Sequence, residues 1–284
     1  NNSIQQLIIN SKQIISDEEY KTISNIIYTY SGIYLKDNKK ILVESRLSNR
    51  LTQLNISSFT EYLNLIKQNP EEIPVLINHI TTNKTDFFRE EQHFTFLQTH
   101  VLPKLLQKNE KDRKVRIWSA ACSSGEEVYT LAMLISEFCL KKGVLCDYKI
   151  LGTDINSDVL HIAQKGEYTS SQVKFIPKYY LHKYFDKKIH ANDTIFVIKN
   201  HIKACVKFRY FNLTKSGLNV PIKFDMIFLR NVLIYFDKKV IEHVVNRLYS
   251  YLKNGGYLFI GHSENLNNIK HNFKHLQGTI YYKE

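Results

Sequence analysis

The segment at 115–129 constrains the fold more than any other part of the chain. It begins with the apolar, β-prone residues Val115 and Ile117 and passes through small side chains to Gly125. Beyond this glycine, apolar residues recur every three or four positions, which indicates a helix. A strand, a tight turn and a helix form the first unit of a nucleotide-binding α/β fold. In that unit a ligand lies against the backbone, and the helix N-terminus offers unpaired N–H groups.

The turn alone does not identify a ligand, because it holds one glycine and is not a GxGxxG motif. An ordinary strand-to-helix connection has the same pattern. Two acidic residues, Glu126 and Glu127, open the helix and complement its macrodipole. They disfavour bound phosphate at this position and favour a ligand that carries hydroxyl or ammonium groups.

Strand and helix patterns alternate through the rest of the chain. Further strands are predicted at 148–154, 205–211, 224–230 and 257–261. This alternation predicts an α/β fold with a mainly parallel sheet and right-handed crossovers. Such sheets bind ligands at the carboxyl ends of their strands. The polar groups expected at that edge are 123–127, Asp154, Asn212 and 230–235.

Asp154 ends the second predicted strand, where an acidic side chain can bind a ribose diol. It could instead cap the helix predicted at 157–165. Asn156 and Ser157 are also capping residues, so the cap does not require Asp154.

The N-terminal part of the chain shows helical patterns without strands. Ser16 and Glu19 have the spacing of a capping box, at which a helix begins. The predicted organisation is a leader at 1–16, an all-helical domain at 17–80, and a second domain at 81–284 with a small antiparallel β-insertion at about 186–204. The hairpin of this insertion is expected to turn near 191–193. Its exposed edge could bind a peptide, although capping of the core is an equally simple role.

Pro103 is expected to kink or end the helix that begins near Phe94. No apolar run approaches the roughly 20 residues of a membrane span, and the four cysteines show no CxxC spacing. We therefore expect a cytoplasmic protein with reduced thiols, without membrane insertion and without a metal site.

Three basic residues, Lys39, Arg46 and Arg50, form a row on a helix predicted from about 38 to 54. At 3.6 residues per turn they fall within roughly 20° of one line. A solvated face is the simpler interpretation, and a docking surface for an acidic partner is the alternative. The chain has 39 Lys and Arg against 27 Asp and Glu, a formal charge of +12. This charge favours nucleic acid, an anionic membrane surface or an acidic protein as partner.

Six motifs occur in an order that resembles the CheR-type chemotaxis receptor glutamate O-methyltransferases. They are TTNKTDFFRE at 81–90, IWSAACSSGEEVY at 117–129, GTDIN at 152–156, FNL at 211–213, FDMIFLRNVLIYFD at 224–237 and GGYLFIGHSE at 255–264. The N-terminal helices also match, through YSGIYLKDNKK and the arginines that follow it. The resemblance therefore covers nearly the whole chain.

The resemblance implies a Rossmann-like S-adenosylmethionine-dependent methyltransferase fold. An all-helical domain would precede the sheet, and a small antiparallel β-subdomain would be inserted in it. The cofactor would be S-adenosyl-L-methionine, with S-adenosyl-L-homocysteine as product. Glutamates on the cytoplasmic helical bundle of methyl-accepting chemotaxis receptors would become methyl esters. Some family members also bind a receptor's C-terminal peptide through the β-subdomain, and the sequence leaves open whether this chain does.

The resemblance also implies which residues form the site. Asp154 would bind the ribose, and Glu127 would serve the cofactor's other polar groups. Arg89 and Tyr235 would lie near the transferred methyl. The row of Lys39, Arg46 and Arg50 gains a receptor-docking role, because a glutamate-rich receptor bundle is acidic. The implied cofactor contacts are Asn83, Thr85, Arg89, Glu127, Asp154, Asn212, Leu213, Arg230 and Asn231.

The implied reaction needs no general base, because a glutamate carboxylate is already ionised at neutral pH. Two other functions compete with it. Amino-directed nucleic-acid methyltransferases carry an Asn/Asp-Pro-Pro-Tyr/Phe motif where this chain has RNVLIYF, and cytosine-C5 enzymes need a Pro-Cys pair that is absent here. A non-catalytic S-adenosylmethionine-binding regulator would not need every cofactor position filled by a compatible residue, as it is here. We therefore expect an enzyme without a nucleic-acid partner.

Overall fold

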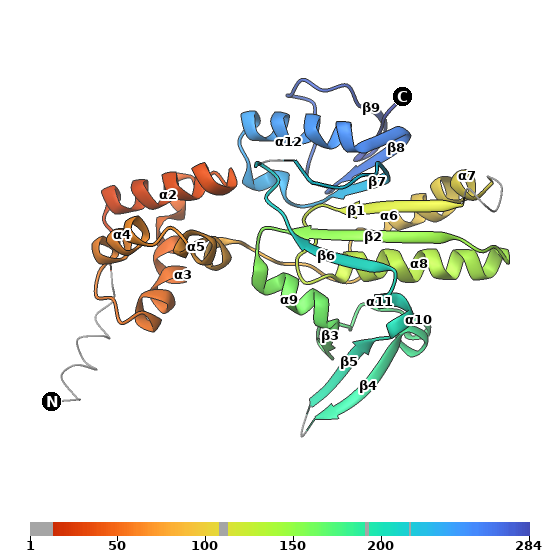
Figure 1. The fold of residues 1–284 in the computed structure, drawn as a ribbon, viewed down its shortest axis with the longest axis horizontal. Helices are drawn as coiled ribbons and strands as arrows, with labels where there is room; N and C mark the ends of the chain where they lie inside the picture. The colour runs from red at the N-terminus through yellow and green to blue at the C-terminus, as the bar shows by residue number, and fades with distance from the viewer. Residues whose placement is uncertain (1–13, 108–112, 191–192, 216) are drawn as a thin grey trace. The chain divides into compact units, whose positions relative to one another are not determined.

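The computed structural model describes residues 14–107, 113–190, 193–215 and 217–284 (Figure 1). These residues form two compact units. One comprises the chain up to Thr82 together with Tyr235–Asp237, and the other comprises Asn83–Ile234 with Lys238–Glu284. Of the leader predicted at 1–16, residues 1–13 lie outside the described residues.

The first unit is built of helices. They are α2 (Asp17–Ser31), the 3-10 helix η1 (Asp37–Lys39), α3 (Lys40–Gln53), α4 (Phe59–Gln68) and α5 (Glu72–Ile80). The predicted capping box is confirmed at the start of α2. The Glu19 N–H donates to Ser16 Oγ over 3.2 Å, and the Ser16 N–H donates to the Glu19 carboxylate over 2.8 Å. Two donors at the helix end are thereby satisfied.

Apolar side chains at helical spacing form the core of this unit. The fully buried ones include Ile23, Ile27, Val43, Leu47, Leu51, Tyr62, Leu76 and Ile77. Val43, Leu47 and Leu51 give α3 its buried stripe. Because Arg46 and Arg50 each precede a residue of this stripe, they lie at the border of the core, and both are only partly exposed.

The second unit is built on a seven-stranded sheet. Its strands, in order across the sheet, are β6 (Val206–Tyr210), β2 (Asp147–Asp154), β1 (Lys114–Ser119), β7 (Phe224–Leu229), β8 (Leu252–Ile260), β10 (Ile280–Tyr282) and β9 (Lys274–Gln277). The first five strands pair in parallel. β10 pairs antiparallel with both of its neighbours, β8 and β9. The predicted α/β fold with a mainly parallel sheet is confirmed.

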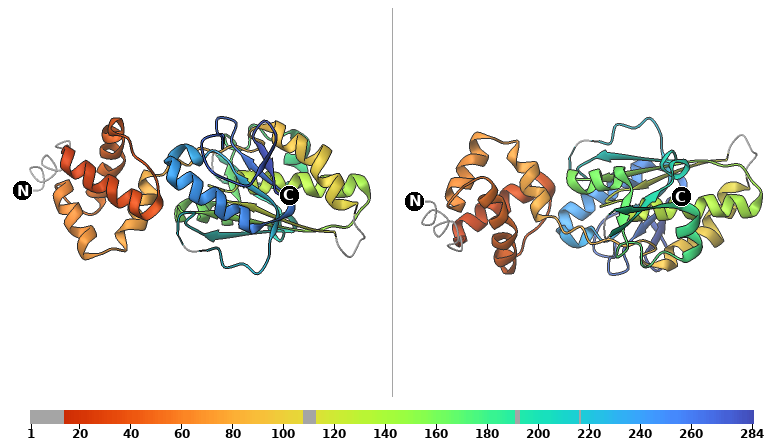
Figure 2. Two further views of the ribbon diagram at one scale, coloured as in Figure 1. Left: turned by 90° about the horizontal axis from the view of Figure 1, so that it is seen from above. Right: turned by 90° about the horizontal axis from the view of Figure 1, so that it is seen from below.

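The strand order reverses between β1 and β7. The chain passes from β1 through α8 (Glu126–Lys142) to β2 in one direction, and from β7 through α12 (Lys238–Tyr251) to β8 in the other. Right-handed crossovers therefore place α8 and α12 on opposite faces of the sheet. Figure 2 shows the ribbon from above and from below. Ligands of such sheets bind in the crevice beyond the carboxyl ends of the two diverging strands.

The centre of the sheet is apolar on both faces. All six residues of β7 are buried, and the rings of Phe228 and Phe259 on neighbouring strands stack with centroids 4.3 Å apart. This continuous burial is expected for a parallel strand covered by helices on both sides. Among the described residues, no helix combines the length and the apolar character that a membrane span requires.

Pro103 was expected to kink or end the helix, and it does not end it, because the segment around it remains helical. α6 (Glu91–Phe96), the π-helical turn η2 (Leu97–Val101) and α7 (Leu102–Leu106) follow one another without a break. In a regular α-helix the proline ring clashes with the carbonyl four residues earlier. The wider π turn directly before Pro103, closed by the Leu102 N–H on the Leu97 carbonyl, changes this spacing.

A smaller antiparallel sheet has the strand order β3-β5-β4. Its strands are β3 (Glu167–Thr169), β4 (Phe185–His190) and β5 (Asp193–Ile198), and it is flanked by α9 (Ser157–Lys165), α10 (Lys178–Tyr184) and α11 (Asn200–Lys203). β3 lies before the insertion predicted at about 186–204 and was not predicted. Its three residues are too few to show a strand pattern. Residues 191–192 of the predicted turn lie outside the described residues.

Candidate functional site

The turn between β1 and α8 is tight. Ser123 and Gly125 both have positive φ, 48° and 95°. A Cβ atom at Gly125 would lie 2.9 Å from the Cβ of Ala163 and 3.1 Å from the hydroxyl of Tyr168. That hydroxyl donates to the Ser124 carbonyl over 2.7 Å. Only glycine therefore fits this position, and the small-residue turn allows close approach to the backbone.

Asp154 ends β2 beside this turn and is 9% exposed. One carboxylate oxygen accepts from the Ser123 N–H over 2.8 Å, and the other accepts from the Asn156 N–H over 3.0 Å. Burial raises the pKa of Asp154, while these two backbone donors favour the charged form. Asn156 caps α9 with its side-chain oxygen, which accepts from the N–H groups of Asp158 and Val159. The alternative role of Asp154 as the helix cap is thus excluded.

Glu127 and Arg230 meet across the ends of α8 and β7. The Ser119 hydroxyl donates to Glu127 Oε1 over 2.7 Å, and Arg230 Nη1 donates to Glu127 Oε2 over 2.9 Å. The side chain of Arg230 is only 3% exposed. A guanidinium buried to this extent requires anionic partners. Glu127 is one of the two carboxylates that pair with Arg230.

The second partner of Arg230 is Glu90, which was not among the predicted site residues. Its Oε2 accepts from Arg230 Nε over 3.3 Å and from Nη2 over 3.1 Å. Its Oε1 accepts from Asn231 Nδ2 over 3.0 Å and from the His262 N–H over 3.3 Å. Burial opposes its charged form, but the Asn231 hydrogen bond and the Arg230 charge keep the pKa of Glu90 below its ordinary value.

The loop at 83–90 reaches the same edge of the sheet. Ser123 Oγ donates to the Asn83 carbonyl over 3.0 Å, and Arg230 Nη2 donates to the Arg89 carbonyl. Arg89 itself is partly buried, and its Nη1 donates to the Lys84 carbonyl over 3.0 Å. Thr85 lies between these anchors.

Asn212 and Leu213 follow β6 and lie next to β2. The Phe211 N–H donates to the Asp154 carbonyl over 2.9 Å. The Asn212 side-chain oxygen accepts from both the N–H and the hydroxyl of Thr214, over 3.0 and 2.8 Å. The structure thus brings the predicted cofactor residues of this unit to the carboxyl ends of β1, β2, β6 and β7.

A second buried carboxylate was also missed from the sequence. Glu264 follows β8, and its Oε2 accepts from the N–H groups of Gly261 and Asn231 over 2.6 and 3.0 Å. Burial raises the pKa of Glu264. The signal that could have identified Glu264 is an acidic residue four positions after the end of an apolar strand, in the GHSE motif. For Glu90 the signal was an acidic residue next to a predicted catalytic arginine.

The remaining predicted residues belong to the helical unit. The backbone carbonyl of Tyr235 accepts a hydrogen bond from the Tyr34 N–H over 2.8 Å. Lys39 is exposed, and Arg46 donates to Thr82 Oγ1 over 2.9 Å and to a carbonyl of α5. The structure therefore places Tyr235 and the basic row in a different unit from Arg89.

Arg50 has an internal partner. Its Nε and Nη2 donate to the two oxygens of Glu72 over 2.8 and 2.7 Å, and the Tyr62 hydroxyl donates to the same carboxylate over 3.0 Å. Glu72 is 5% exposed. The charge of Arg50 is therefore balanced inside the helical unit, which leaves Lys39 as the most exposed cation of the row.

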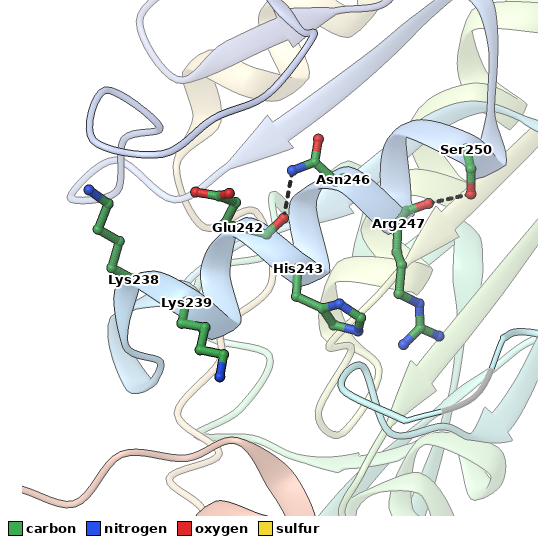
Figure 3. A pocket seen from close by; sticks show the side chains of 7 residues that line it. All are labelled: Lys238, Lys239, Glu242, His243, Asn246, Arg247 and Ser250. Carbon is green, nitrogen blue, oxygen red and sulfur yellow. Dashed lines mark hydrogen bonds between the residues drawn. The ribbon is translucent and has the colours of Figure 1, made fainter.

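A surface hollow runs along α12 (Figure 3). It is lined by Lys238, Lys239, Glu242, His243, Asn246, Arg247 and Ser250. Arg247 Nη1 donates to the Leu213 carbonyl over 3.1 Å, so α12 supports the loop that carries Leu213. The described lining of this hollow includes none of the residues predicted to contact the cofactor.

Comparison with known proteins agrees with this arrangement of units. Residues 83–282 match the family described as CheR methyltransferase, SAM binding domain, and residues 18–81 match CheR methyltransferase, all-alpha domain. The chain is 41% identical over 273 residues to the chemotaxis protein methyltransferase of Borreliella burgdorferi, with 95% of each chain covered. It is 36% identical to the chemotaxis protein methyltransferase of Salmonella typhimurium, over 94% of this chain and 90% of that one. Its identity to the Escherichia coli chemotaxis protein methyltransferase is 35%, over 94% and 91% of the two chains.

Proposed function

The chain belongs to the CheR methyltransferase family, and from this premise we propose how its residues direct a methyl group to a receptor glutamate. The enzyme uses S-adenosylmethionine, which supplies a methyl group on a sulfonium. The acceptor is a glutamate carboxylate of a methyl-accepting chemotaxis receptor, and the product is a methyl ester.

Asp154 binds the ribose of the methyl donor. Its two oxygens accept from the N–H groups of Ser123 and Asn156, and the Ile155 N–H also favours its charged form. Because an ionised carboxylate offers about four acceptor sites, one remains for a hydroxyl of the diol. The tight turn at Gly125 supports this role, because it keeps side chains away from the backbone next to Asp154.

Glu127 and Arg230 serve the polar end of the donor, together with Asn83, Thr85 and Asn231. Glu127 offers a carboxylate to an ammonium group, and Arg230 offers donors to a carboxylate. Asn212 and Leu213 complete the contact set beyond β6. The observation that carries this assignment is the convergence of Asn83, Glu127, Asp154 and Arg230 at the strand ends.

Arg89 orients the acceptor rather than activating it. The acceptor carboxylate is ionised near neutral pH, since the ordinary pKa of glutamate is about 4.3. A guanidinium that holds one carboxylate oxygen leaves the other free to attack in line with the departing sulfur. Such alignment can lower a barrier by about 7–11 kcal/mol. Tyr235 borders the transferred methyl in this proposal.

Lys39, Arg46 and Arg50 form the docking side of the helical unit for the receptor. A receptor bundle rich in glutamates is acidic, and this row provides Arg46 and Arg50 on α3 and Lys39 at the end of η1, directly before α3. The Arg50–Glu72 pair reduces the contribution of Arg50. Lys39, which is exposed, contributes most to steering.

The reaction is tested by incubating the protein with labelled S-adenosylmethionine and receptor-bearing membranes. We expect protein-bound label that is released as methanol in alkali, because carboxyl esters hydrolyse there and N-methyl groups do not. Base-stable label on the receptor would contradict glutamate esterification, and label on added nucleic acid would indicate a different acceptor.

The donor site is tested by Asp154→Asn. The amide loses the charge and one acceptor, so the Kd for S-adenosylmethionine should rise about tenfold or more by calorimetry. Asn156→Ala is the matched control. It removes the cap of α9 at a cost of about 1 kcal/mol in unfolding free energy, but keeps the backbone N–H that bonds to Asp154. Similar Kd changes for both variants would contradict the ribose role.

A further inference from the structure

Glu90 accepts hydrogen bonds from three residues in two segments of the sheet unit. It accepts two hydrogen bonds from Arg230, one from Asn231 and one from the backbone of His262. Its side chain is 12% exposed. A buried carboxylate costs free energy unless its acceptor sites are filled, and here four donors fill them.

The orientation of Arg230 follows from these bonds. The guanidinium is planar and presents its donors in a fixed fork. With Nε and Nη2 directed at Glu90, only Nη1 remains for Glu127, at 2.9 Å. Glu127 is held from its other oxygen by Ser119. Glu90 therefore sets the direction of Arg230, and through it the position of Glu127.

The backbone on both sides of this contact is strained. Phe88, Glu90 and Asn231 all have φ between 57° and 59°, in the left-handed region that non-glycine residues avoid. Such conformations persist where the surroundings fix them, and they concentrate at functional sites. The buried ring of Phe87 and the Phe88 N–H on Thr130 Oγ1 hold the loop in this form.

We propose that Glu90 is a positioning residue, which orients Arg230 and Asn231 for the methyl donor and fixes the backbone of the adjacent Arg89. This inference rests on the proposed function, because Arg230 and Asn231 are donor contacts there. Glu90 acts through these residues and does not itself touch the donor.

A double-mutant cycle on the full chain tests this role, with S-adenosylmethionine binding measured by calorimetry. Glu90→Gln keeps the shape of the side chain but removes the charge and places an amide NH₂ against the Arg230 donors. In the wild-type background it should raise the Kd about tenfold or more, since hydrogen bonds to charged groups are strong. In an Arg230→Ala background the same change should raise the Kd by a clearly smaller factor, because the two hydrogen bonds to Arg230 are already gone and only the contacts with Asn231 and His262 remain.

Glu137→Gln is the matched control for removing a buried carboxylate from the same unit. Glu137 accepts from Tyr184 and Tyr179 over 2.5 and 3.0 Å and pairs with Lys183, away from the strand ends. We expect it to leave the Kd within about twofold. If Glu90→Gln unfolds the chain, Glu90→Asp replaces it. That variant keeps the charge, but its shorter side chain does not reach Arg230 and Asn231 together, so the Kd should still rise.

Equal effects of Glu90→Gln in the two backgrounds would overturn the inference, as would an unchanged Kd in the wild-type background. The proposed function fails in a different way, by absence of donor binding in the wild-type protein or by an Arg230→Ala variant that binds as well as wild type.

Discussion

At the scale of single residues, burial determines which charge state each group near the strand ends prefers. It raises the pKa of Asp154 and of Glu264, because their charged forms lose hydration. His93 shifts in the opposite direction, because its charged form is the protonated one. Burial, followed by the positive charge of Arg230, lowers the pKa of His93 to about 3. Its ring is 2% exposed, and its Nε2 lies 2.8 Å from Thr279 Oγ1.

His93 should make the sheet unit less stable as the pH falls. The unfolded chain binds a proton at His93 near pH 6.5, whereas the folded chain binds it only near pH 3. Between these values the unfolded state holds more protons, so stability is complete above about pH 6.5 and is lost progressively as the pH falls toward 3. This single group should lower the free energy of unfolding by about 2 kcal/mol between pH 7 and pH 5. Urea titrations at both pH values measure the difference.

His93→Gln separates this effect from the carboxylates, whose raised pKa values act with the opposite sign. Glutamine does not titrate, and its side chain offers polar atoms to Thr279 and Glu90. The variant should lose less stability than wild type between pH 7 and pH 5. Identical losses in the two proteins would show that His93 does not carry the pH dependence.

Sequence reasoning located Asp154 and Glu127 because each stands at a strand or helix end within a short local pattern. It did not assign Glu90, whose partners Arg230 and Asn231 lie 140 and 141 positions away. It also treated Arg50 as one cation of a row, whereas the structure pairs it with Glu72. A local pattern contains no information about such distant pairs, which exist only once the elements have packed.

At the scale of elements, the alternation of apolar patterns predicted the parallel sheet, because each strand is long enough to show its own period. The three residues of β3 are too few to show one, and the π turn before Pro103 depends on hydrogen bonds that no residue type signals. The turn from β1 into α8 depends on one glycine, which packs against α9 through Ala163.

Gly125→Ala should destabilise the sheet unit more than an alanine at another left-handed glycine. Gly143 at the end of α8 has φ 61° with nothing within 4 Å of a new Cβ, so Gly143→Ala costs only backbone strain, about 1–2 kcal/mol. At Gly125, with φ 95°, the same strain is joined by contacts of 2.9 Å to Ala163 and 3.1 Å to Tyr168. We expect an additional loss of about 1–3 kcal/mol from overpacking. Urea unfolding of the two variants compares them directly, and equal losses would contradict the packing argument.

At the scale of the whole molecule, the proposed roles are divided between the two units. Residues assigned to the methyl donor lie in the sheet unit, and the basic row lies in the helical unit together with Tyr235. The motif at 224–237 contributes to both, because it supplies β7 and Arg230 to one unit and Tyr235 to the other. Receptor docking and donor binding should therefore respond to different substitutions.

Lys39→Glu should lower receptor methylation without changing donor binding. Lys39 is exposed on the helical unit, so its reversal removes an attraction for an acidic receptor and adds a repulsion. Charges at the rim of an interface act mainly on the association rate. We expect kcat/KM for the receptor to fall about threefold to tenfold, with the Kd for S-adenosylmethionine unchanged. The loss should shrink as ionic strength rises from about 0.05 to 0.3 M, because exposed charges are screened over shorter distances.

Lys67→Glu provides the comparison, since Lys67 is an exposed lysine of the same unit on α4 and lies outside the row. Both variants change the net charge of +12 by the same amount, so a general effect of chain charge would appear in both. Arg50→Ala is unsuitable, because it would leave the Glu72 carboxylate buried without its cation and destabilise the helical unit. A loss confined to Lys39→Glu would locate docking near η1 and the start of α3. Equal losses would assign the effect to net charge and contradict a specific surface.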